Sequence, residues 1–430
     1  MACQRAAPML TGMTEPPRRP IPLLGEIDLG ARAARALTAE LARHAGPKTG
    51  LLVGVTADSA VLAAALDALL PGDTLTLVPL TGAGDELGAH LSSLGPWVGQ
   101  RVRVVETLAE ADPADVVVVA QPLGGGAEET RAYLDELRKY LTEGAVLAVA
   151  ALAGPWFGLG AGEELGRQAA FSGVGTDLVL RNQPPVRVHR LRYTAARAAT
   201  AARLTPAYRP STVPLTRGMN VDSNGVAAAG IALGLAAATR ILRPKSRLWL
   251  LPALAALPVA AFFRDPDRDL PEDESAVVAA SDGTVLSVQR LADPALGAGE
   301  LLRIAVFLSI VDVHVNRAPV AGKVVEFWVE DGGFAPAMKP EAEHNVAAYT
   351  VLETVRGRVV VAQRTGLVAR RIVHRAPIGS LLARGERFGL IRFGSRTDVY
   401  LPAGSAEPTV APGDKVLGGA TTIARWYPRD

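Results

Sequence analysis

Two hydrophobic patterns alternate along the first 200 residues of the chain. Runs with helical periodicity, such as Asp28–Gly46, Ser59–Leu70 and Glu129–Leu141, are separated by short runs that are continuously apolar. The apolar runs that predict buried strands are 49–56, 73–80, 101–107, 114–123 and 145–152. Because strands that alternate with helices are typical of a parallel sheet covered by helices, region 24–204 predicts a Rossmann-like α/β domain.

The middle of the chain carries two longer apolar runs. A predicted linker, 205–224, leads to Gly225–Leu242 and Leu248–Phe263, with the basic segment "RPKSR" between them. Each run is shorter than the roughly 20 residues that cross a bilayer. Three structures stay open for this short apolar helical hairpin, 225–263: two tight transmembrane helices, a hairpin within one leaflet, and two buried helices. We favour the one-leaflet hairpin, because the positive-inside rule would otherwise place the flanking regions outside, without an export signal.

The last part of the chain, 264–430, has the composition of a mainly-β domain. Short runs rich in Val, Ile, Leu and Tyr are separated by glycine turns. Helices are expected only near Phe262 and over Leu367–Ala376. The run "GLIRFGSRTDVYLP", Gly389–Pro402, predicts a strand that continues through Gly394 and Ser395.

Composition narrows the classes of function. The formal net charge is +2, which does not call for a nucleic-acid partner. The single cysteine, Cys3, excludes an internal disulfide and fits a reducing compartment. The first residues lack the apolar core of a signal peptide, so we expect a disordered leader over 1–23. We expect no metal site, because no group of His, Cys and carboxylates has metal-ligand spacing.

The α/β region resembles the class I methyltransferases that use S-adenosylmethionine, because the order of its predicted elements is similar. Two features of that family's cofactor site are missing. The loop after the first strand, in "LLVGVTADSAV", offers only Gly54, and the second strand ends in Val78-Pro79-Leu80 rather than in an acidic residue. The resemblance therefore implies a degenerate domain without methyltransferase activity.

The part of the chain after the α/β region and the linker resembles the phosphatidylserine decarboxylase family, in its short, archaeal-type branch. Five segments carry the resemblance in order, namely "FFRDPDRDLP", "ASDGTV", "FLSIVDVHVNRAPVAGKV", "VARRIV" and "IRFGSRTDVYLP". They span about 220–425. The resemblance implies a pyruvoyl decarboxylase domain that converts phosphatidylserine into phosphatidylethanolamine and CO2.

The same resemblance implies that the chain cuts itself between Gly394 and Ser395. The Ser395 hydroxyl would attack the Gly394 carbonyl, and elimination and hydrolysis would leave a covalent pyruvoyl group, the cofactor, at position 395. That group would form a Schiff base with the substrate. By this resemblance Asp282 and His314 assist Ser395. Some relatives carry a second histidine where this chain has Arg317.

Arginine suits a lipid phosphate because its guanidinium binds two oxygens at once. Arg317, Arg392 and Arg396 are the candidate substrate-binding residues, and Arg370 and Arg371 are further candidates. Asp312 is either a partner that orients His314 or a turn-forming or salt-bridging residue. His344 is expected in a loop, and His374 in a structural role or near lipid headgroups.

The expected partners are phosphatidylserine, membrane lipids, and the large and small chains cut from one precursor. Whether the chain forms a homo-oligomer stays open. The expected location is the cell membrane, peripheral or monotopic on the cytoplasmic side. Two other functions stay open, a bifunctional lipid decarboxylase and methyltransferase, and a non-enzymatic membrane scaffold.

Overall fold

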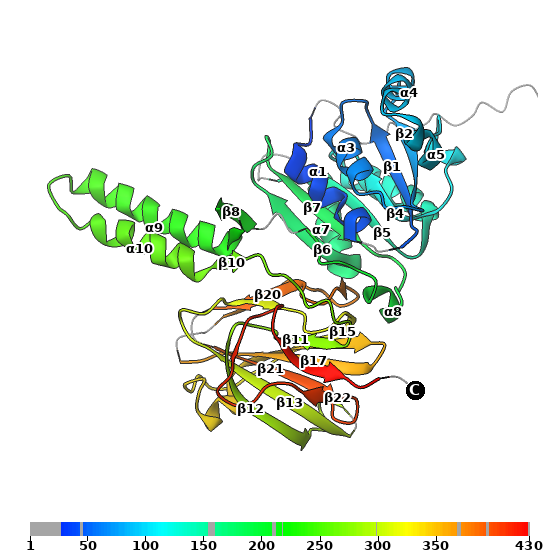
Figure 1. Cartoon of the computed structure of the whole chain (residues 1–430). Coiled ribbons are helices and arrows are strands. Elements are labelled where there is room, and N and C mark those ends of the chain that lie inside the picture. The colour runs from blue at the N-terminus through cyan, green and yellow to red at the C-terminus, as the bar shows by residue number, and fades with distance from the viewer. Residues whose placement is uncertain are drawn as a thin grey trace, which may run out of the picture.

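The structure is a computed structural model that describes residues 27–43, 46–153, 160–208, 212–216, 218–297, 299–367, 371–392 and 395–428. The predicted leader 1–23 and the cleavage residue Gly394 lie outside the described residues. Figure 1 shows an α/β region at the top, a helical hairpin that projects from the middle of the chain, and a β region below.

The α/β region is built on a seven-stranded sheet with the order β3-β2-β1-β4-β5-β7-β6. The β1 to β5 neighbours are parallel, whereas β7 is antiparallel to both β5 and β6. The order reverses between β1 and β4, as in doubly wound sheets, which confirms the predicted Rossmann-like class. The strands are β1 (Thr49–Val55), β2 (Thr74–Pro79), β3 (Val102–Val104), β4 (Ala114–Val119), β5 (Leu141–Leu152), β6 (Gly173–Val179) and β7 (Val186–Leu191).

Helices cover both faces of this sheet. One apolar core joins the sheet to α1 through α5, and a second core joins the other face to α6 and α7. The predicted helix 28–46 is interrupted at Thr38, whose hydroxyl donates to the Ala34 carbonyl at 3.0 Å. The sequence pattern missed α4, α5, α7, β6 and β7. The helices are α1 (Ala31–Leu37), α2 (Ala39–Arg43), α3 (Ala60–Asp67), α4 (Gly84–Ser93), α5 (Pro96–Arg101), α6 (Ala127–Leu137), α7 (Ala161–Ser172) and α8 (Ala198–Ala201), with 3₁₀ turns η1 (Leu108–Glu110) and η2 (Arg138–Tyr140).

The predicted hairpin is present and consists of α9 (Ser223–Leu242) and α10 (Leu250–Phe262). Helix α9 starts before the predicted Gly225, because the Asp222 side chain accepts a hydrogen bond from Asn224 N at 2.9 Å and caps the helix. Among the described residues, α9 is the one helix long and apolar enough to cross a membrane.

A small sheet closes the base of the hairpin. Its order is β10-β9-β8, so the strands that enter and leave the hairpin pair with each other. The segment predicted as a linker, 205–224, therefore contains two strands rather than irregular chain alone. The strands are β8 (Thr212–Thr216), β9 (Met219–Asp222) and β10 (Arg264–Pro266).

The β region is organised around an antiparallel eight-stranded sheet with the order β19-β15-β16-β17-β21-β13-β12-β23. Two small sheets, β11-β24-β22 and β14-β20-β18, accompany it, which confirms the mainly-β prediction. The strands are β11 (Ala276–Val278), β12 (Gly283–Ala292), β13 (Glu300–Leu308), β14 (Val315–Arg317), β15 (Gly322–Glu330), β16 (Ala347–Thr354), β17 (Gly357–Arg364), β18 (Ile372–His374), β19 (Leu381–Leu382), β20 (Arg387–Ile391), β21 (Ser395–Pro402), β22 (Ala406–Pro408), β23 (Lys415–Val416) and β24 (Thr422–Trp426), with one 3₁₀ turn, η3 (Pro340–His344).

Two local predictions in this region are wrong. The strand predicted through Gly389–Pro402 is two strands in different sheets, β20 in the small sheet and β21 in the large one. The helix predicted over Leu367–Ala376 is not formed where the chain is described, since β18 occupies Ile372–His374. In both cases the neighbouring strands, and not the local apolar pattern, decide which sheet or element the segment joins.

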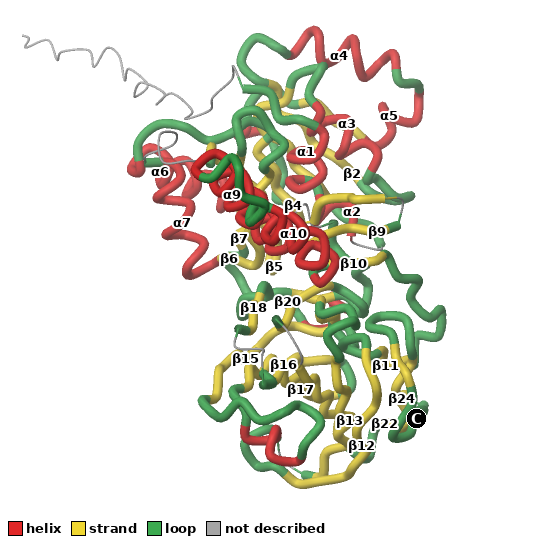
Figure 2. Tube along the Cα trace, turned by 90° about the vertical axis from the view of Figure 1, so that its left-hand side faces the viewer, coloured by secondary structure: helices red, strands yellow, loops and turns green. Residues whose placement is uncertain are grey.

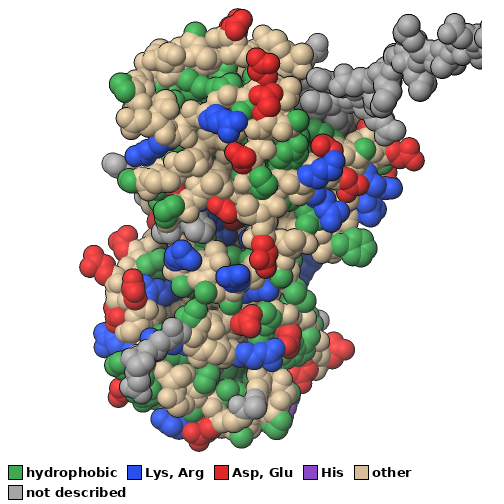
Figure 3. Space-filling model, turned by 90° about the vertical axis from the view of Figure 1, so that its right-hand side faces the viewer, with side chains coloured by type: hydrophobic (Ala, Val, Ile, Leu, Met, Phe, Trp, Pro, Cys, Tyr) green, Lys and Arg blue, Asp and Glu red, His purple; other side chains and the backbone are tan. Residues whose placement is uncertain are grey.

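The α/β region lies above the β region (Figure 2), and polar side-chain contacts connect it to the edge of the large sheet. Arg43 of α2 forms an ion pair with Glu386, and its Nη2 also donates to the Leu381 carbonyl at 3.0 Å. Arg192 Nη1 donates to the Gly379 carbonyl at 2.7 Å. The side of the molecule turned away from the hairpin carries intermixed acidic and basic side chains (Figure 3).

Candidate active site

Ser395 is the first residue of β21 and lies opposite Leu308 of β13. Its side chain is fully buried, and Ser395 Oγ has no hydrogen-bond partner among the described residues. Burial of an unbonded hydroxyl costs about 1–3 kcal/mol, so stability alone does not account for a serine here. An unbonded hydroxyl is available for attack on a neighbouring carbonyl.

The chain changes from the small sheet to the large sheet between Ile391 and Ser395. On the β20 side, Ile391 N donates to the His314 carbonyl at 3.2 Å. Arg392 N donates to the Arg371 carbonyl, also at 3.2 Å. The crossing therefore begins at a residue that contacts His314 of the "DVHVNR" segment, and it ends at Ser395.

The loop that carries Asp282 is tied to the same strand as Ser395. Ser281 Oγ and Thr397 Oγ1 are 2.7 Å apart, and both side chains are fully buried. Gly283 follows with a φ of 151°, and a Cβ there would lie 2.1 Å from the Phe307 carbonyl oxygen. The "DG" pair is thus explained by close packing of β12 on β13, which excludes a side chain at position 283.

Both carboxylate oxygens of Asp282 are held by donors. Gly418 N donates to Oδ1 at 2.7 Å, and Arg268 Nη2 donates to Oδ2 at 2.7 Å. Burial nevertheless raises the pKa of Asp282 above its ordinary value. Asp282 does not bond Ser395 Oγ in this arrangement, so any direct proton transfer between them would require a movement of one of the two.

His314 lies just before β14 with its side chain buried. Its Nδ1 is 2.8 Å from the Asp312 carbonyl oxygen. Because a carbonyl only accepts, Nδ1 must carry the proton, and the basic lone pair of the neutral ring is on Nε2. The Asp312 carboxylate accepts from Ser309 N at 2.7 Å and from Ser309 Oγ at 2.6 Å. The Asp312 side chain therefore stabilises the turn, whereas its backbone carbonyl orients the imidazole of His314.

Burial lowers the pKa of His314 to about 4. The ring of Phe262 packs on the imidazole, with 4.1 Å between the ring centroids. The folded chain therefore keeps His314 neutral at physiological pH, which suits a proton acceptor better than a proton donor.

The three predicted substrate arginines are not gathered in one place. Arg317 is buried, and its Nη2 donates to Asp265 Oδ1 at 3.0 Å and to the Pro266 carbonyl at 2.8 Å. Burial lowers the pKa of Arg317 to about 10. Its guanidinium thus joins β14 to β10 at the base of the hairpin.

Arg396 and Arg392 differ in their surroundings. Successive residues of a strand point to opposite faces, so Arg396 points away from the face of Ser395. Its Nε donates to Asp398 Oδ1 at 2.6 Å. Arg392 is half-buried, and its Nη2 donates to Asn224 Oδ1 of α9 at 2.8 Å. Arg370 lies outside the described residues.

His374 and His344 have different surroundings from His314. His374 stacks on Phe327 with 3.9 Å between ring centroids, and its Nε2 lies 2.6 Å from the Ala376 carbonyl oxygen, so its environment is structural. His344 is the last residue of η3. In the part of the chain that is described, no group of three or more His, Cys, Asp and Glu could hold a metal ion.

The sequence pattern missed two buried amides near the cleavage site, Asn316 and Gln363. Gln363 Nε2 donates to Asn316 Oδ1 at 2.6 Å, and both side chains are fully buried. Asn316 stands inside the segment "DVHVNR", between His314 and Arg317, which was the available signal. Nothing local distinguishes Gln363 from an ordinary strand residue.

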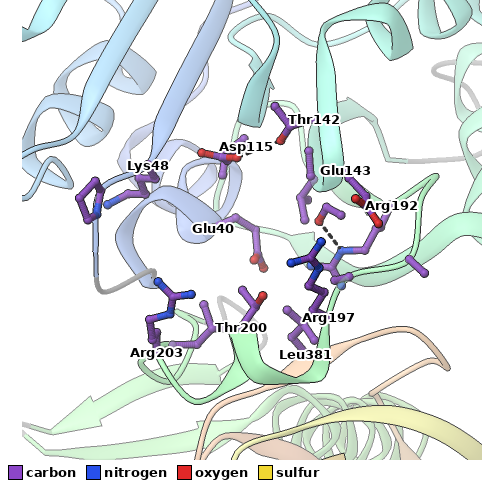
Figure 4. A pocket seen from close by; sticks show the side chains of 18 residues that line it. Glu40, Lys48, Asp115, Thr142, Glu143, Arg192, Arg197, Thr200, Arg203 and Leu381 are labelled. Atoms are coloured by element: carbon purple, nitrogen blue, oxygen red, sulfur yellow. Dashed lines mark hydrogen bonds between the residues drawn. The ribbon is translucent and has the colours of Figure 1, made fainter.

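A pocket lies between the α/β region and the β region (Figure 4). Its volume is about 470 Å³, and acidic and basic side chains are mixed in its wall, among them Glu40, Lys48, Asp115, Glu143 and Arg192. Doubly wound folds bind ligands beyond the carboxyl ends of their strands. This pocket lies at the opposite edge, since Lys48, Asp115 and Thr142 are at the amino ends of β1, β4 and β5.

Solved structures similar to the α/β region are methyltransferases. An O-methyltransferase from Streptomyces achromogenes, crystallised with SAM, covers 38% of this chain and 78% of its own length at 14% identity, with a TM-score of 0.28. The C-terminal domain of precorrin-6Y C5,15-methyltransferase from Rhodobacter capsulatus covers 37% of this chain and 87% of its own length at 16% identity, with a TM-score of 0.27. Similarity at this level carries no conclusion about activity.

The β region has much closer relatives. Residues 256–424 match the family described as phosphatidylserine decarboxylase. The phosphatidylserine decarboxylase proenzyme of Carboxydothermus hydrogenoformans is 44% identical over 179 residues, which are 41% of this chain and 84% of the relative. The proenzyme of Symbiobacterium thermophilum is 47% identical over 182 residues, again 41% of this chain and 84% of the relative. The chain, whose β region supplies the matched segment, therefore belongs to the phosphatidylserine decarboxylase family.

Proposed function

We propose that this chain decarboxylates phosphatidylserine to phosphatidylethanolamine and CO2 after it cuts its own backbone between Gly394 and Ser395. The observation that carries the proposal is the buried, unbonded Ser395 Oγ at the point where the chain changes sheets. Relatives with more than 40% identity are named proenzymes, which supports a processed chain. The pieces would be a large chain that ends at Gly394 and a small chain that begins at position 395.

In the cleavage step, Ser395 Oγ attacks the Gly394 carbonyl carbon and its proton passes to a base. The C–N bond breaks as the C–O ester bond forms, and the nitrogen takes up a proton. Loss of the Cα proton of residue 395 then expels the Gly394 carboxylate from Cβ. Water finally replaces the nitrogen, which leaves as ammonia, and a ketone remains at Cα.

We assign His314 as the base for this step. Its backbone lies beside the crossing, its Nδ1 proton is directed to the Asp312 carbonyl, and burial keeps the ring neutral. The basic Nε2 is therefore the nitrogen that can take the serine proton. Asp282 would assist from the loop tied to β21, where Arg268 and Gly418 fix its carboxylate.

The residues around position 395 fit a small covalent group that must be kept from water. Ser395 and Thr397 are fully buried, and Phe262 shields the imidazole. A pyruvoyl group supplies a carbonyl that condenses with the substrate amine and draws electrons from the bond to the carboxylate. Arg392 is our choice for the lipid phosphate, because it is half-buried at the base of the hairpin. Arg317 and Arg396 stay weaker candidates, since carboxylates already hold their guanidinium groups.

We propose that the hairpin enters one leaflet from the cytoplasmic side. A 20-residue helix such as α9 extends about 30 Å, whereas α10, with 13 residues, extends roughly 20 Å, which is too short for the hydrocarbon core. Large side chains along both helices are exposed, including Ile231, Leu235, Leu251, Leu254 and Leu257. Arg243, Lys245 and Arg247 in the turn suit anionic headgroups.

Intact-mass spectrometry of the purified chain tests the proposal. We expect two chains that separate at 394–395, and a small chain whose mass shows a ketone in place of the amino group of Ser395. A single full-length chain that still releases CO2 from phosphatidylserine would contradict the proposed cofactor. Cleavage together with CO2 release from phosphatidylserine would exclude the scaffold alternative, which requires neither.

A further inference from the structure

Gln363 shares a face of the eight-stranded sheet with Ser395. It stands on β17 directly opposite Thr397 of β21, and Thr397 is two residues from Ser395. Residues two apart on a strand point to the same face. Cα atoms of diagonal neighbours in an antiparallel sheet are roughly 7–8 Å apart, so the Gln363 side chain can reach the surroundings of position 395.

Asn316 reaches the same face from the small sheet. It pairs with Gly389 of β20, and a Cβ added to Gly389 would lie 3.1 Å from Gln363 Nε2. The hydrogen bond from Gln363 Nε2 to Asn316 Oδ1 therefore joins the two sheets where they meet. Asn316 is also two residues from His314 along the chain, so the amide contact links the segment of His314 to the sheet face that carries Ser395.

This amide pair is left with unused hydrogen-bonding groups. Asn316 Nδ2 and Gln363 Oε1 have no partner among the described residues, although both side chains are fully buried. If both amides were turned over, the pair would still leave one unbonded carbonyl and one unbonded NH2 group. Each unbonded buried group costs free energy, so a third group that completes the network is the expected explanation.

We propose that the Asn316–Gln363 pair is the subsite for the amino-acid end of the substrate headgroup, with the spare amide N–H donating to its α-carboxylate. The inference rests on the proposed function, because the carboxylate is the group that must leave as CO2. The side chains of Asn316, Gln363 and Ser395 are buried in the uncleaved chain. The subsite would therefore admit a ligand only after the backbone is cut at 394–395.

A neutral donor suits this task better than a cation. A guanidinium would stabilise the substrate carboxylate more strongly in the ground state than in the transition state, where the negative charge leaves the carboxylate. Such binding would raise the barrier to decarboxylation. The arginines next to Gln363 and Ser395 in sequence, Arg364 and Arg396, point to the opposite face and share Asp398. The sheet thus keeps these cations on one side and the amides on the other.

The test uses processed protein in which borohydride has reduced the ketone to an alcohol, so that no turnover occurs. Calorimetry then compares glycerophosphoserine with glycerophosphoethanolamine, which lacks only the carboxylate. We expect Asn316→Leu to weaken glycerophosphoserine binding about 10- to 100-fold and to leave glycerophosphoethanolamine binding unchanged. Gln363→Met should show the same selectivity to a smaller degree. Thr350→Val is the matched control, because Thr350 Oγ1 is also buried and unbonded but lies on β16, and it should change neither affinity.

Equal losses for both ligands, or no loss for either, would overturn the subsite. Asn316→Asp keeps the side-chain size and covers the case in which Asn316→Leu does not fold, and its charge should repel only glycerophosphoserine. If the amide variants fold but stay uncut, the pair belongs to cleavage and the subsite is wrong. A wild-type chain that is itself uncut or inactive would instead contradict the proposed function.

Discussion

The ring of Phe262 packs against the imidazole of His314, with 4.1 Å between the centroids and 39° between the planes. Phe262 is the last residue of α10, so the proposed membrane hairpin touches the proposed base directly. Phe263 packs with Val221 and Leu390 in the same small core. Deletion of the whole hairpin would therefore disturb His314, and membrane attachment has to be tested with substitutions on its outer turns.

Ser395→Ala should remain a single uncut chain, because it removes both the nucleophile and the oxygen that leaves from Cβ. Denaturing gels and intact mass measure the outcome, and thermal unfolding of the variant checks that it is folded. Appearance of a fragment that begins at position 395 in Ser395→Ala would rule out serine-dependent cleavage.

His314→Gln should slow cleavage by about 10² to 10⁴, the usual contribution of general-base help. Asp282→Asn should slow it as well, because the loop beside β21 loses its charge. The rate is followed from the uncut chain made by cell-free synthesis. His374→Gln is the control. The His374 ring stacks on Phe327 and contacts the Ala376 carbonyl, so this substitution should leave the cleavage rate unchanged. Wild-type cleavage with lost decarboxylation in His314→Gln would assign the histidine to the second reaction alone.

The pH dependence of cleavage should reflect the lowered pKa of His314. An imidazole with its ordinary pKa of about 6.5 would lose its basic form below that value, whereas His314 should stay basic down to about pH 4. Cleavage should therefore keep its rate between pH 7 and pH 5. A half-maximal rate near pH 6.5 would mean that His314 is not buried during the reaction, or is not the base.

The same shift has a consequence for stability. The unfolded chain takes up a proton on His314 below about pH 6.5, while the folded chain does so only near pH 4. Between these values the unfolded state binds more protons, so the stability of the folded chain falls as the pH falls. In Ser395→Ala, replacement of His314 by Gln should reduce the loss of stability between pH 7 and pH 4, as measured by urea unfolding.

Leu254→Ser combined with Leu257→Ser should move the protein away from anionic vesicles in flotation experiments. These side chains are 72% and 74% exposed on α10. Each substitution removes about 1.5–3 kcal/mol of the free energy gained when the leucine is buried in the membrane. Leu178→Ser with Leu180→Ser, exposed positions of the α/β region, is the matched control and should still float. Equal flotation of both double variants would show that the hairpin is not the anchor.

Arg43→Met should lower the stability of the intact chain by about 3–5 kcal/mol, because it removes the buried ion pairs that Arg43 forms with Glu386 and Glu40. Adding Glu386→Gln should recover much of this loss. Arg103→Met is the control, since its pair with Asp112 is exposed and should contribute less than about 1 kcal/mol. Thermal unfolding measures all four proteins. A loss no larger than that of the control would show that this contact does not hold the two regions together.

The sequence by itself identified the alternation of helices and strands in the α/β region, the apolar hairpin, the family and the segments that contain Ser395, His314 and Asp282. These features are local, since each depends on the periodicity or the residue types of a short segment. The missed elements of the α/β region have a weaker local pattern. Helix α4, for example, buries only Leu87 and Leu91. Helix α9 begins two residues before its predicted start because the Asp222 side chain caps it, and Asp222 lies inside the predicted linker.

Only the tertiary structure decided what surrounds the site. That the chain changes sheets between Ile391 and Ser395 depends on pairing with β14 and β13, which are far away in sequence. Burial under Phe262 sets the proton affinity of His314, and pairing with Asp265 fixes the guanidinium of Arg317. Such contacts join segments separated by tens to hundreds of residues, and burial is a property of the packed whole. The amide pair beside Ser395 could therefore be recognised only after the two sheets had been brought together.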